Sequence, residues 1–165
     1  MISVSPDKLS LRERKKEHVV EYFNKTRDGQ VQSMIPGGTK SVEDALAMYE
    51  ESLKKGAASY GRTIYCQEQY IGDIWCYCLD RKSEPNAMLS YCIFEKDYWN
   101  KGIATLAVSL FMKELIGKFG IKSMGAFLYA DNAGSRRVLE KNGFVLKEKQ
   151  LEGERASLYY EIGIV

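Results

Sequence analysis

The chain has 165 residues, of which 45% are apolar and 28% are charged. This length and composition predict one compact domain over residues 1–165 and exclude a disordered or fibrous protein. The net charge of +2, without a dense lysine and arginine run, argues against a nucleic-acid partner. The N-terminus has no apolar core of signal-peptide length and no stretch approaches about 18 apolar residues, so we expect a cytoplasmic protein without a membrane-spanning segment.

The cysteines all fall in apolar, strand-like segments: they are Cys66, Cys76, Cys78 and Cys92. No CxxC pair and no histidine-rich partner accompanies them, which argues against a zinc site. We therefore predict free, buried thiols and no bound metal. The single histidine, His18, is predicted to occupy a surface position on a helix.

The N-terminal residues predict a strand followed by two helices. Residues 8–14 alternate leucine with polar side chains at the period of a strand, and residues 15–26 gather apolar side chains on one side of a helix. The second helix is predicted to begin at Ser41, where Asp44 three positions later completes a capping box. It is predicted to end at Gly56, because glycine is common just after a helix C-terminus.

The middle of the chain is predicted to hold three strands and a buried helix. Residues 59–67 and 70–79 are rich in β-branched and aromatic side chains and meet across residues 68–69, which predicts a hairpin. Residues 87–94 form a third run of this kind. Residues 102–120 are apolar on almost every side for three turns, so we expect a helix buried in the core.

The C-terminal part is predicted to add three strands and a short helix. Residues 121–130 are strand-like, residues 132–144 form a helix with Asn132 as its N-cap, and residues 144–151 and 156–164 close the chain as two strands. The element order is therefore β-α-α-β-β-β-α-β-α-β-β. Only the connections through the two later helices can join parallel strands. We predict a single α+β domain with a mixed, largely antiparallel sheet flanked by helices.

The stretch YWNKGIAT, residues 98–105, lies where the third strand run meets the buried helix. The first amides of a helix have no internal partner and carry the positive end of its dipole, so they attract phosphate. Gly102 and Ala104 leave the backbone accessible, and Lys101 adds a compact positive charge. The junction predicts a diphosphate cradle that is neither a GxxxxGK[ST] loop nor a GxGxxG fingerprint. The alternative is a glycine that simply begins a tightly packed helix.

Two stretches of the chain resemble motifs of the GNAT N-acetyltransferase superfamily, in its branch of ribosomal-protein N-terminal acetyltransferase-like enzymes. That branch typically shows a YWGKGYAT-like loop and then N-x-x-S-x-R-v-L-E-K-x-G-F on the following strand-helix-strand. The first motif is matched by Tyr98, Trp99, Lys101, Gly102, Ala104 and Thr105. The second is matched by Asn132, Ser135, Arg137, Val138, Leu139, Glu140, Lys141, Gly143 and Phe144. The resemblance covers about residues 87–150, and the element order of the whole chain is similar to the family's fold.

The resemblance implies acetyl-CoA as the cofactor and a place for each of its parts. The diphosphate would lie on the backbone of Asn100, Lys101, Gly102, Ile103, Ala104 and Thr105. The pantetheine arm would bond along the strand that ends at Cys92, Ile93 and Phe94, where the sheet of this fold splays. Asn132 and Ser135 would face the pantetheine and the sulfur. The chain departs from the branch pattern at Asn100, where glycine is usual, and at Leu106, where glutamate is common.

Acetyl transfer to an amine needs a group that accepts the proton of the amine and a donor for the leaving thiolate. Ser135 is the predicted acid, with Tyr129 as the competing candidate. Asp73 is the predicted base, because a desolvated carboxylate among apolar strand residues has a raised pKa. Alternatively Asp73 marks a bulge or faces solvent, and Glu95 or Glu161 is the base, or no dedicated base exists. A backbone amide at the end of the pantetheine-binding strand could stabilise the thioester oxygen.

We expect an enzyme that transfers acetyl from acetyl-CoA directly to a primary amine in a ternary complex, as a monomer or a homodimer. The acceptor would be a protein N-terminus or a small amine such as a polyamine or an aminoglycoside. In this fold the first two helices and the hairpin usually shape its site. One alternative is a non-catalytic acyl-CoA-binding regulatory module. Another is a nucleotide- or RNA-binding domain that uses Lys101, Arg136 and Arg137, although the small net charge argues against it.

Overall fold

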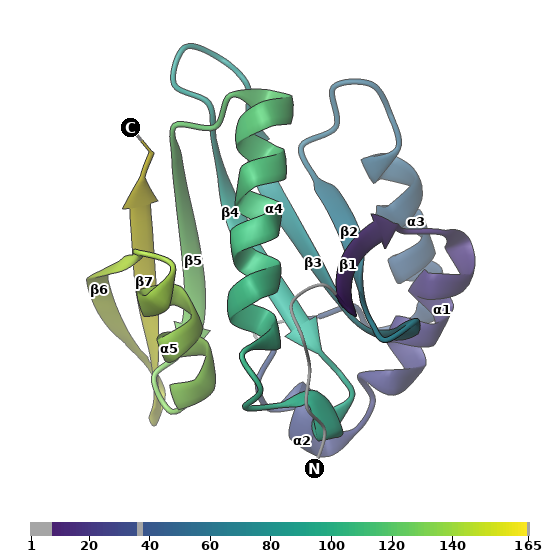
Figure 1. Ribbon diagram of the computed structural model, residues 1–165. Coiled ribbons are helices and arrows are strands. Elements are labelled where there is room, and N and C mark those ends of the chain that lie inside the picture. Colours follow the sequence, from purple (N-terminus) through teal and green to yellow (C-terminus); the bar gives the residue numbers. More distant parts are fainter. Residues whose placement is uncertain (1–7, 36–37, 165) are drawn as a thin grey trace.

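The computed structural model describes residues 8–35 and 38–164 of the chain (Figure 1). Its N-terminal half contains β1 (Leu9–Glu13), α1 (Lys16–Lys25), α2 (Gly29–Gln32), α3 (Val42–Ser52), β2 (Tyr60–Cys66), β3 (Gln69–Asp80) and β4 (Asn86–Ile93). Its C-terminal half contains the 3₁₀ helix η2 (Lys96–Tyr98), α4 (Ile103–Phe119), β5 (Ser123–Tyr129), α5 (Ala133–Lys141), β6 (Val145–Glu152) and β7 (Arg155–Gly163). The predicted order is confirmed, with the short helices α2 and η2 added to it.

The strands of the described residues form one sheet in the order β1-β2-β3-β4-β5-β7-β6. All neighbours are antiparallel except β4 and β5, which run parallel on either side of the connection through α4. The sequence left room for a second parallel pair around α5. That pair does not form, because α5 leads to the edge strand β6 and β7 then returns between β5 and β6. The predicted mixed, largely antiparallel α+β sheet is confirmed.

The parallel pair β4–β5 opens soon after it begins. Its register holds for Asn86↔Ser123, Ala87↔Met124 and Met88↔Gly125 and then stops. From Leu89 onwards β4 is paired only with β3, and the second half of β5 is paired only with β7. The two strands separate towards their C-terminal ends, beside the start of α4 (Figure 1). The facing edges of both strands therefore present main-chain donors and acceptors that a bound molecule can use.

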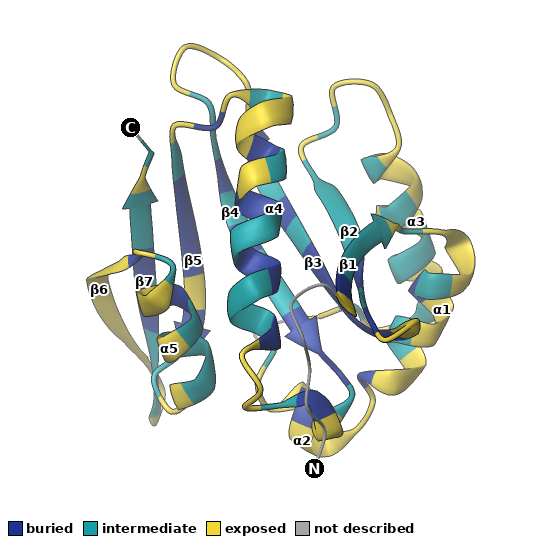
Figure 2. Ribbon diagram, in the orientation of Figure 1, coloured by how far each residue is buried: buried dark blue, intermediate teal, exposed yellow. Residues whose placement is uncertain are grey.

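Helices cover the two faces of the sheet unevenly. α4 and α5 lie on one face, and α1 and α3 lie on the other face, over the N-terminal strands (Figure 1). The predicted burial of α4 is confirmed, since buried residues run along the helix and the strands behind it (Figure 2). Its fully buried side chains are Ala107, Val108, Phe111 and Leu115. Of the helices in residues 8–35 and 38–164, none is long and apolar enough to cross a membrane.

The four cysteines do not share one environment. Cys66, Cys76 and Cys92 are free and buried, as predicted. Cys78 is exposed, which corrects the prediction. The register between β3 and β4 shifts between Tyr77 and Asp80, and Cys78 itself has a φ of 51°. A bulge of this kind breaks the alternation of faces along β3, so an apolar strand segment does not by itself bury Cys78. Within the described part of the chain, no group of three His, Cys, Asp or Glu side chains is placed to hold a metal ion.

His18 is half-buried in α1 rather than on the surface, which also corrects the prediction. Its Nδ1 accepts a hydrogen bond of 2.9 Å from the amide of Lys15, and its Nε2 lies 2.8 Å from the hydroxyl of Tyr65. The ring packs edge-on against Tyr70. Since Nδ1 accepts, the neutral ring carries its hydrogen on Nε2 and donates it to Tyr65. Burial lowers the pKa of His18.

The predicted ends of α3 and of the hairpin are displaced by a few residues. α3 begins after its N-cap Ser41, whose hydroxyl accepts a hydrogen bond of 3.1 Å from the amide of Asp44. The helix ends at Ser52, however, and Gly56 lies in the turn beyond it with a φ of 77°. The β2–β3 hairpin turns at residues 67–68, one position earlier than predicted.

Candidate active site

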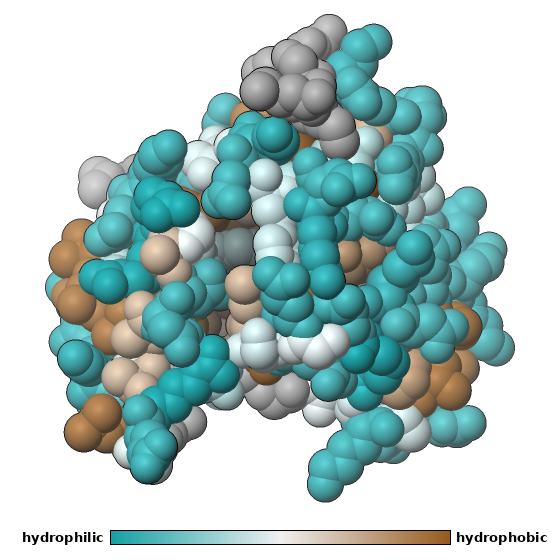
Figure 3. Space-filling model, turned by 90° about the horizontal axis from the view of Figure 1, so that it is seen from below, coloured by the Kyte–Doolittle hydropathy of each residue, from teal (hydrophilic) through white to brown (hydrophobic). Residues whose placement is uncertain are grey.

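A cavity of about 500 Å³ occupies the gap between β4 and β5. Its walls come from the end of β4, the start of α4, the second half of β5 and the start of α5. α2 and the residues that follow it close the remaining side. Seen from below, the surface is hollowed near its middle (Figure 3). Residues 98–105 and 132–135, which the sequence singled out separately, therefore line one cavity.

The start of α4 has the features of a phosphate-binding helix end. Gly102 is its N-cap in a left-handed conformation, with φ 78° and ψ 5°, and no side chain caps the first amides. A Cβ built on Gly102 would meet no atom within 4 Å, so the backbone there is open. Unpaired amides and the positive end of the helix dipole favour an anion at this point. The following residues Ile103, Ala104 and Thr105 also line the cavity.

The backbone conformation of Asn100 shows why glycine is usual at this position in the branch that the chain resembles. Its φ is 59°, in the left-handed region that side chains generally avoid. Asparagine is one of the few residues other than glycine that adopts this conformation at low cost. The departure from the branch pattern therefore keeps the turn, because the backbone of Asn100 follows the path that a glycine would allow. Leu106, the other departure, packs against the main core rather than lining this cavity.

Basic side chains line the cavity near the start of α4 and along α5. Lys101, Arg137 and Lys141 line it. Lys101 and Lys141 also line an adjoining hollow of about 380 Å³. Among the described lining residues the one carboxylate is Asp131, and it is paired with Arg155 at 2.9 Å. The three cations and the start of α4 together give a positive potential that suits a diphosphate.

The end of β4 presents Ile93 to the gap and turns Phe94 away from it. The amide of Phe94 donates a hydrogen bond of 2.9 Å to the carbonyl of Ile71 in β3, and its ring packs against Tyr70. Phe94 does not line the cavity, so the geometry does not support the cofactor contact expected of it, whereas Cys92 and Ile93 do line it. Because successive amides point to opposite edges of a strand, the amide of Ile93 points into the gap.

Trp99 has a position that the sequence did not reveal. Its indole Nε1 donates a hydrogen bond of 2.7 Å to the carbonyl of Ile93, and its ring lines the cavity. The bond ties the loop before α4 to the gap-facing edge of β4. Trp99 therefore holds the loop before α4 and the end of β4 in a fixed relation.

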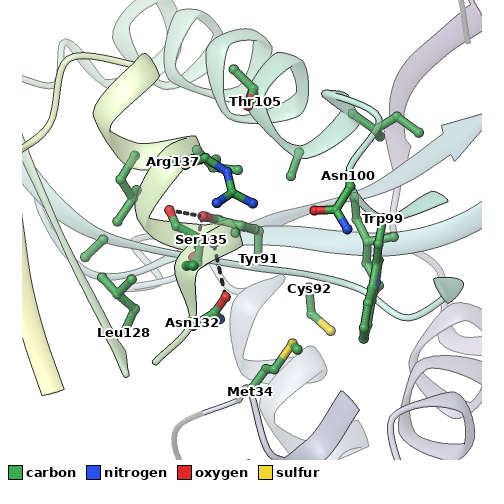
Figure 4. Close-up of a pocket in the computed structure, with 18 of the residues that line it drawn as sticks. Met34, Tyr91, Cys92, Trp99, Asn100, Thr105, Leu128, Asn132, Ser135 and Arg137 are labelled. Carbon is green, nitrogen blue, oxygen red and sulfur yellow. Dashed lines mark hydrogen bonds between the residues drawn. The ribbon is translucent and has the colours of Figure 1, made fainter. Parts of the chain in front are cut away.

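Ser135 and Tyr91 meet across the gap (Figure 4). Ser135 Oγ lies 2.7 Å from the hydroxyl of Tyr91, and both residues line the cavity. Asn132 Oδ1 accepts a hydrogen bond of 3.1 Å from the amide of Ser135, which caps α5 as predicted. Burial raises the pKa of Tyr91 well above its ordinary value. Tyr129, the competing acid, lies outside the lining, and the guanidinium of Arg155 stacks 3.5 Å from its ring centroid.

The sequence model of a protein family, described as the acetyltransferase (GNAT) domain, matches residues 8–145 of the chain. The chain belongs to this acetyltransferase family. It is similar to the uncharacterized N-acetyltransferase YoaA of Bacillus subtilis (strain 168), with 27% identity over 128 residues that cover 75% of this chain and 68% of YoaA. The predicted superfamily, the class of enzyme and acetyl-CoA as its acyl donor are thereby confirmed.

Solved structures of acetyltransferases share the fold over nearly the whole chain. One, from Salmonella typhimurium, modifies the N-terminal serine of ribosomal protein L7/L12; it has a TM-score of 0.79 and 19% identity, covering 96% of each chain. Another is spermidine N-acetyltransferase from Vibrio cholerae in complex with CoA and spermine. Its TM-score is 0.82 at 14% identity, and the match covers 95% of this chain and 96% of that one. At these identities the likeness establishes the fold.

Asp73 of this acetyltransferase is buried, but it does not line the cavity. The hydroxyl of Tyr70 donates a hydrogen bond of 2.6 Å to its Oδ1, and Arg14 Nε lies 3.4 Å from its Oδ2. Burial raises the pKa of Asp73 to about 6, although Arg14 and Tyr70 act in the opposite direction. Its register partner in β4 is Cys92, which does line the cavity. The carboxylate is therefore desolvated one strand away from the cavity, and its role as the base stays a prediction.

The two other candidate bases of the acetyltransferase also lie outside the cavity lining. Glu95 Oε1 is paired with Lys25 Nζ at 3.1 Å. Glu161 accepts a hydrogen bond of 2.9 Å from the hydroxyl of Tyr159 on β7. Each of the two carboxylates has a partner that is also outside the cavity lining, so neither is placed by this geometry to meet an amine there.

Proposed function

We propose that this acetyltransferase moves acetyl from acetyl-CoA directly to a primary amine while both molecules occupy the gap between β4 and β5. The observation that carries the proposal is the order of groups along the cavity. In Figure 4, Tyr91 and Ser135 lie between Arg137 on one side and Cys92 and Met34 on the other. A donor anchored at the start of α4 would thus bring its thioester to the hydroxyl pair, with space beyond it for an amine.

Direct transfer is favoured over an acyl-enzyme because the cavity offers no activated nucleophile among its described residues. Burial raises the pKa of the Cys92 thiol to about 12, so the thiol stays protonated near neutrality and is a poor nucleophile. The hydroxyl of Ser135 is paired with Tyr91, a phenol that keeps its own proton, rather than with a base. A serine nucleophile needs such a base beside it.

Each step of the transfer except deprotonation of the amine has a group of this chain at hand. Acetyl-CoA supplies the activated thioester carbonyl, and the lining residues Lys101, Arg137 and Lys141 would hold its diphosphate. The gap-facing amide of Ile93 would stabilise negative charge on the carbonyl oxygen. Ser135 would give its proton to the departing sulfur. The amine, entering as its neutral form, would lose its proton to water.

The acceptor side of the cavity favours an amine attached to an apolar or neutral group. The described residues of α2 and the segment after it contribute Val31, Met34 and Ile35 to the lining. A polyamine carries further cations that need carboxylates, and Asp131 is already paired with Arg155. We therefore propose the α-amine of a peptide or a small apolar amine as the acceptor, rather than a polyamine.

An amine panel assayed for thioester consumption, beside a thermal shift with CoA, tests the proposal. Ser135→Ala should lower kcat about 100-fold while the Kd for CoA changes less than about twofold, because the hydroxyl acts on the leaving group. The exposed Ser83 offers a control, since Ser83→Ala removes the same hydroxyl far from the cavity. Stabilisation by CoA without turnover on any amine would favour the non-catalytic acyl-CoA-binding module. Neither stabilisation nor turnover would overturn the proposed site.

A further inference from the structure

Tyr91 and Ser135 form a hydroxyl pair that spans the two sides of the gap. Tyr91 belongs to β4 and Ser135 to the first turn of α5, and their oxygens lie 2.7 Å apart. The Tyr91 hydroxyl also lies 3.4 Å from the carbonyl oxygen of Ser135. The hydrogen bond from the amide of Ser135 to the Asn132 cap fixes the backbone of Ser135, which holds the serine side chain beside Tyr91 (Figure 4).

A single hydrogen lies between the two oxygens, and the chemistry of the groups decides which residue supplies it. A phenol is more acidic than an aliphatic alcohol and is therefore the better donor, whereas the alcohol is the better acceptor. Tyr91 holds its proton firmly, because burial raises its pKa. With Tyr91 as the donor, the hydrogen of Ser135 is not used in the pair. It is free to point into the cavity that both residues line.

We propose that Tyr91 is a positioning residue for Ser135: it donates to Ser135 Oγ and so directs the serine hydrogen at the sulfur of the departing CoA. This assignment rests on the proposed function. When the carbon–sulfur bond breaks, its electron pair moves to sulfur, which takes the proton of Ser135. The attacking nitrogen gives one proton to water and Ser135 regains one from water, so the site returns to its starting state.

The same hydrogen bond strengthens during the step. As Ser135 releases its proton, negative charge develops on Oγ, and a hydrogen bond to a charged acceptor is stronger than one to a neutral acceptor. Tyr91 therefore stabilises the transition state more than the ground state, which raises kcat rather than substrate affinity. A tyrosine that merely filled the sheet would act on folding and would not separate kcat from KM.

Tyr91→Phe tests the assignment, because it removes the hydroxyl and keeps the ring. With the amine that gives turnover, we expect kcat to fall about 10-fold or more, and KM for acetyl-CoA to change less than about twofold. In a Ser135→Ala background the same substitution should cost less than about twofold, since a positioning residue has no effect without the group that it positions. Tyr77→Phe is the matched control: this tyrosine lies on β3 outside the cavity lining and should leave kcat unchanged.

The outcomes separate this assignment from the proposed function. If wild-type protein turns over an amine and Tyr91→Phe does so equally fast, the assignment is wrong and the transferase stands. If the losses of Tyr91→Phe and Ser135→Ala multiply in the double variant, Tyr91 acts independently of Ser135 and the assignment is again wrong. If wild-type protein binds CoA and acetylates no amine, the proposed function is wrong, and the assignment of Tyr91, which rests on it, is wrong as well. A thermal melt of each variant checks that it is folded.

Discussion

Arg155 Nη2 donates a hydrogen bond of 2.8 Å to the carbonyl oxygen of Ser33 and so joins the start of β7 to the end of α2. The same nitrogen lies 2.9 Å from Asp131 Oδ1. α2 and residue 131 both contribute to the cavity lining, so one side chain ties these two parts of its wall together. The bridge joins segments far apart in the chain and lies on the side of the cavity where we place the acceptor.

Arg155→Ala should loosen the acceptor wall. We expect the KM of the amine to rise several-fold while the KM of acetyl-CoA stays within about twofold, because we place the donor contacts at the other end of the cavity. The free energy of unfolding in urea should fall by about 1 kcal/mol, a modest loss because the side chain is 38% exposed.

Arg81→Ala is a matched control for the Arg155 bridge. Arg81 Nη2 donates to the carbonyl of Ala57 at 3.1 Å, and its guanidinium stacks 4.7 Å from the ring centroid of Phe119, away from the cavity. It should show a similar loss of stability without the change in amine KM. Equal amine KM values for the two alanine variants would contradict a role of Arg155 at the acceptor wall.

Gly102→Val should weaken CoA binding at least about 10-fold. Its φ of 78° is strained for any side chain, and the new methyl groups would project where we place the diphosphate, beside the α4 amides. Gly120→Val is the matched control, because Gly120 ends the same helix with a φ of 66° and also has nothing within 4 Å of a Cβ. Isothermal titration with CoA should separate the two variants, although both lose stability. Equal CoA affinities would move the phosphate site away from α4.

The residues at the cofactor end of the proposed site could be singled out from the sequence because the features that mark them are local; that they bind the cofactor stays a prediction. A glycine and a lysine at the start of an apolar helix, or an asparagine cap three residues before a serine, act within one turn of backbone. The roles of Tyr91 and Trp99 depend instead on where β4 and β5 separate. Strand periodicity says which face a side chain occupies, and it does not say which edge of the strand is left open. The sequence therefore did not show that the amide of Phe94 points to β3 rather than into the gap.

Two further differences between prediction and structure have a geometric cause. α2 spans only Gly29–Gln32, which is too short to show helical periodicity, and an Asp-Gly pair such as Asp28-Gly29 is typical of a turn. The Asp28 carboxylate in fact caps this turn by accepting from the amides of Gln30 and Val31. Cys78 was assigned to the wrong environment because a bulge changes the alternation of faces without a glycine or proline to mark it.

Gly72→Ala should destabilise the fold by at least about 1–3 kcal/mol. A Cβ on Gly72 would overlap the carbonyl oxygen of Cys92 and lie 2.9 Å from Ile93 Cα, so the backbone of β4 would have to move. Backbone cannot yield as a flexible side chain does, and overpacking of this kind typically costs about 1–3 kcal/mol or more. Because the displaced residues form the edge of the gap, CoA affinity should fall as well.

Gly117→Ala is the opposite case in the same protein. Gly117 lies inside α4, and a Cβ there would meet nothing within 4 Å. Alanine in a helix interior is favoured over glycine by about 0.5–1 kcal/mol, so this variant should be more stable than wild type. Urea unfolding of the two variants measures both effects. A Gly72→Ala protein as stable as wild type would show that β3 and β4 are not packed as closely as described.

Asp73 should make the stability of the protein fall as the pH rises. Its pKa is raised by burial from 3.8 in the unfolded chain to about 6 in the folded one, although Arg14 and Tyr70 favour the charged form. Between these two values the folded state keeps a proton that the unfolded state releases. The contribution of Asp73 to stability is therefore complete below about pH 4 and is lost as the pH rises through 6. The change amounts to roughly 2–3 kcal/mol.

Asp73→Asn isolates this effect, because every other group titrates in both proteins. The unfolding free energy of the variant minus that of wild type, measured in urea from pH 4 to pH 7, should rise by about 2–3 kcal/mol. Tyr70→Phe removes the donor that stabilises the carboxylate at 2.6 Å, so it should move the midpoint of the wild-type curve to higher pH. If the unfolding free energy of Asp73→Asn minus that of wild type does not change between pH 4 and pH 7, Asp73 titrates in the folded protein as it does in the unfolded chain. In that case its burial beside Arg14 would not favour the neutral acid, and the argument for Asp73 as a base near neutrality would fail with it.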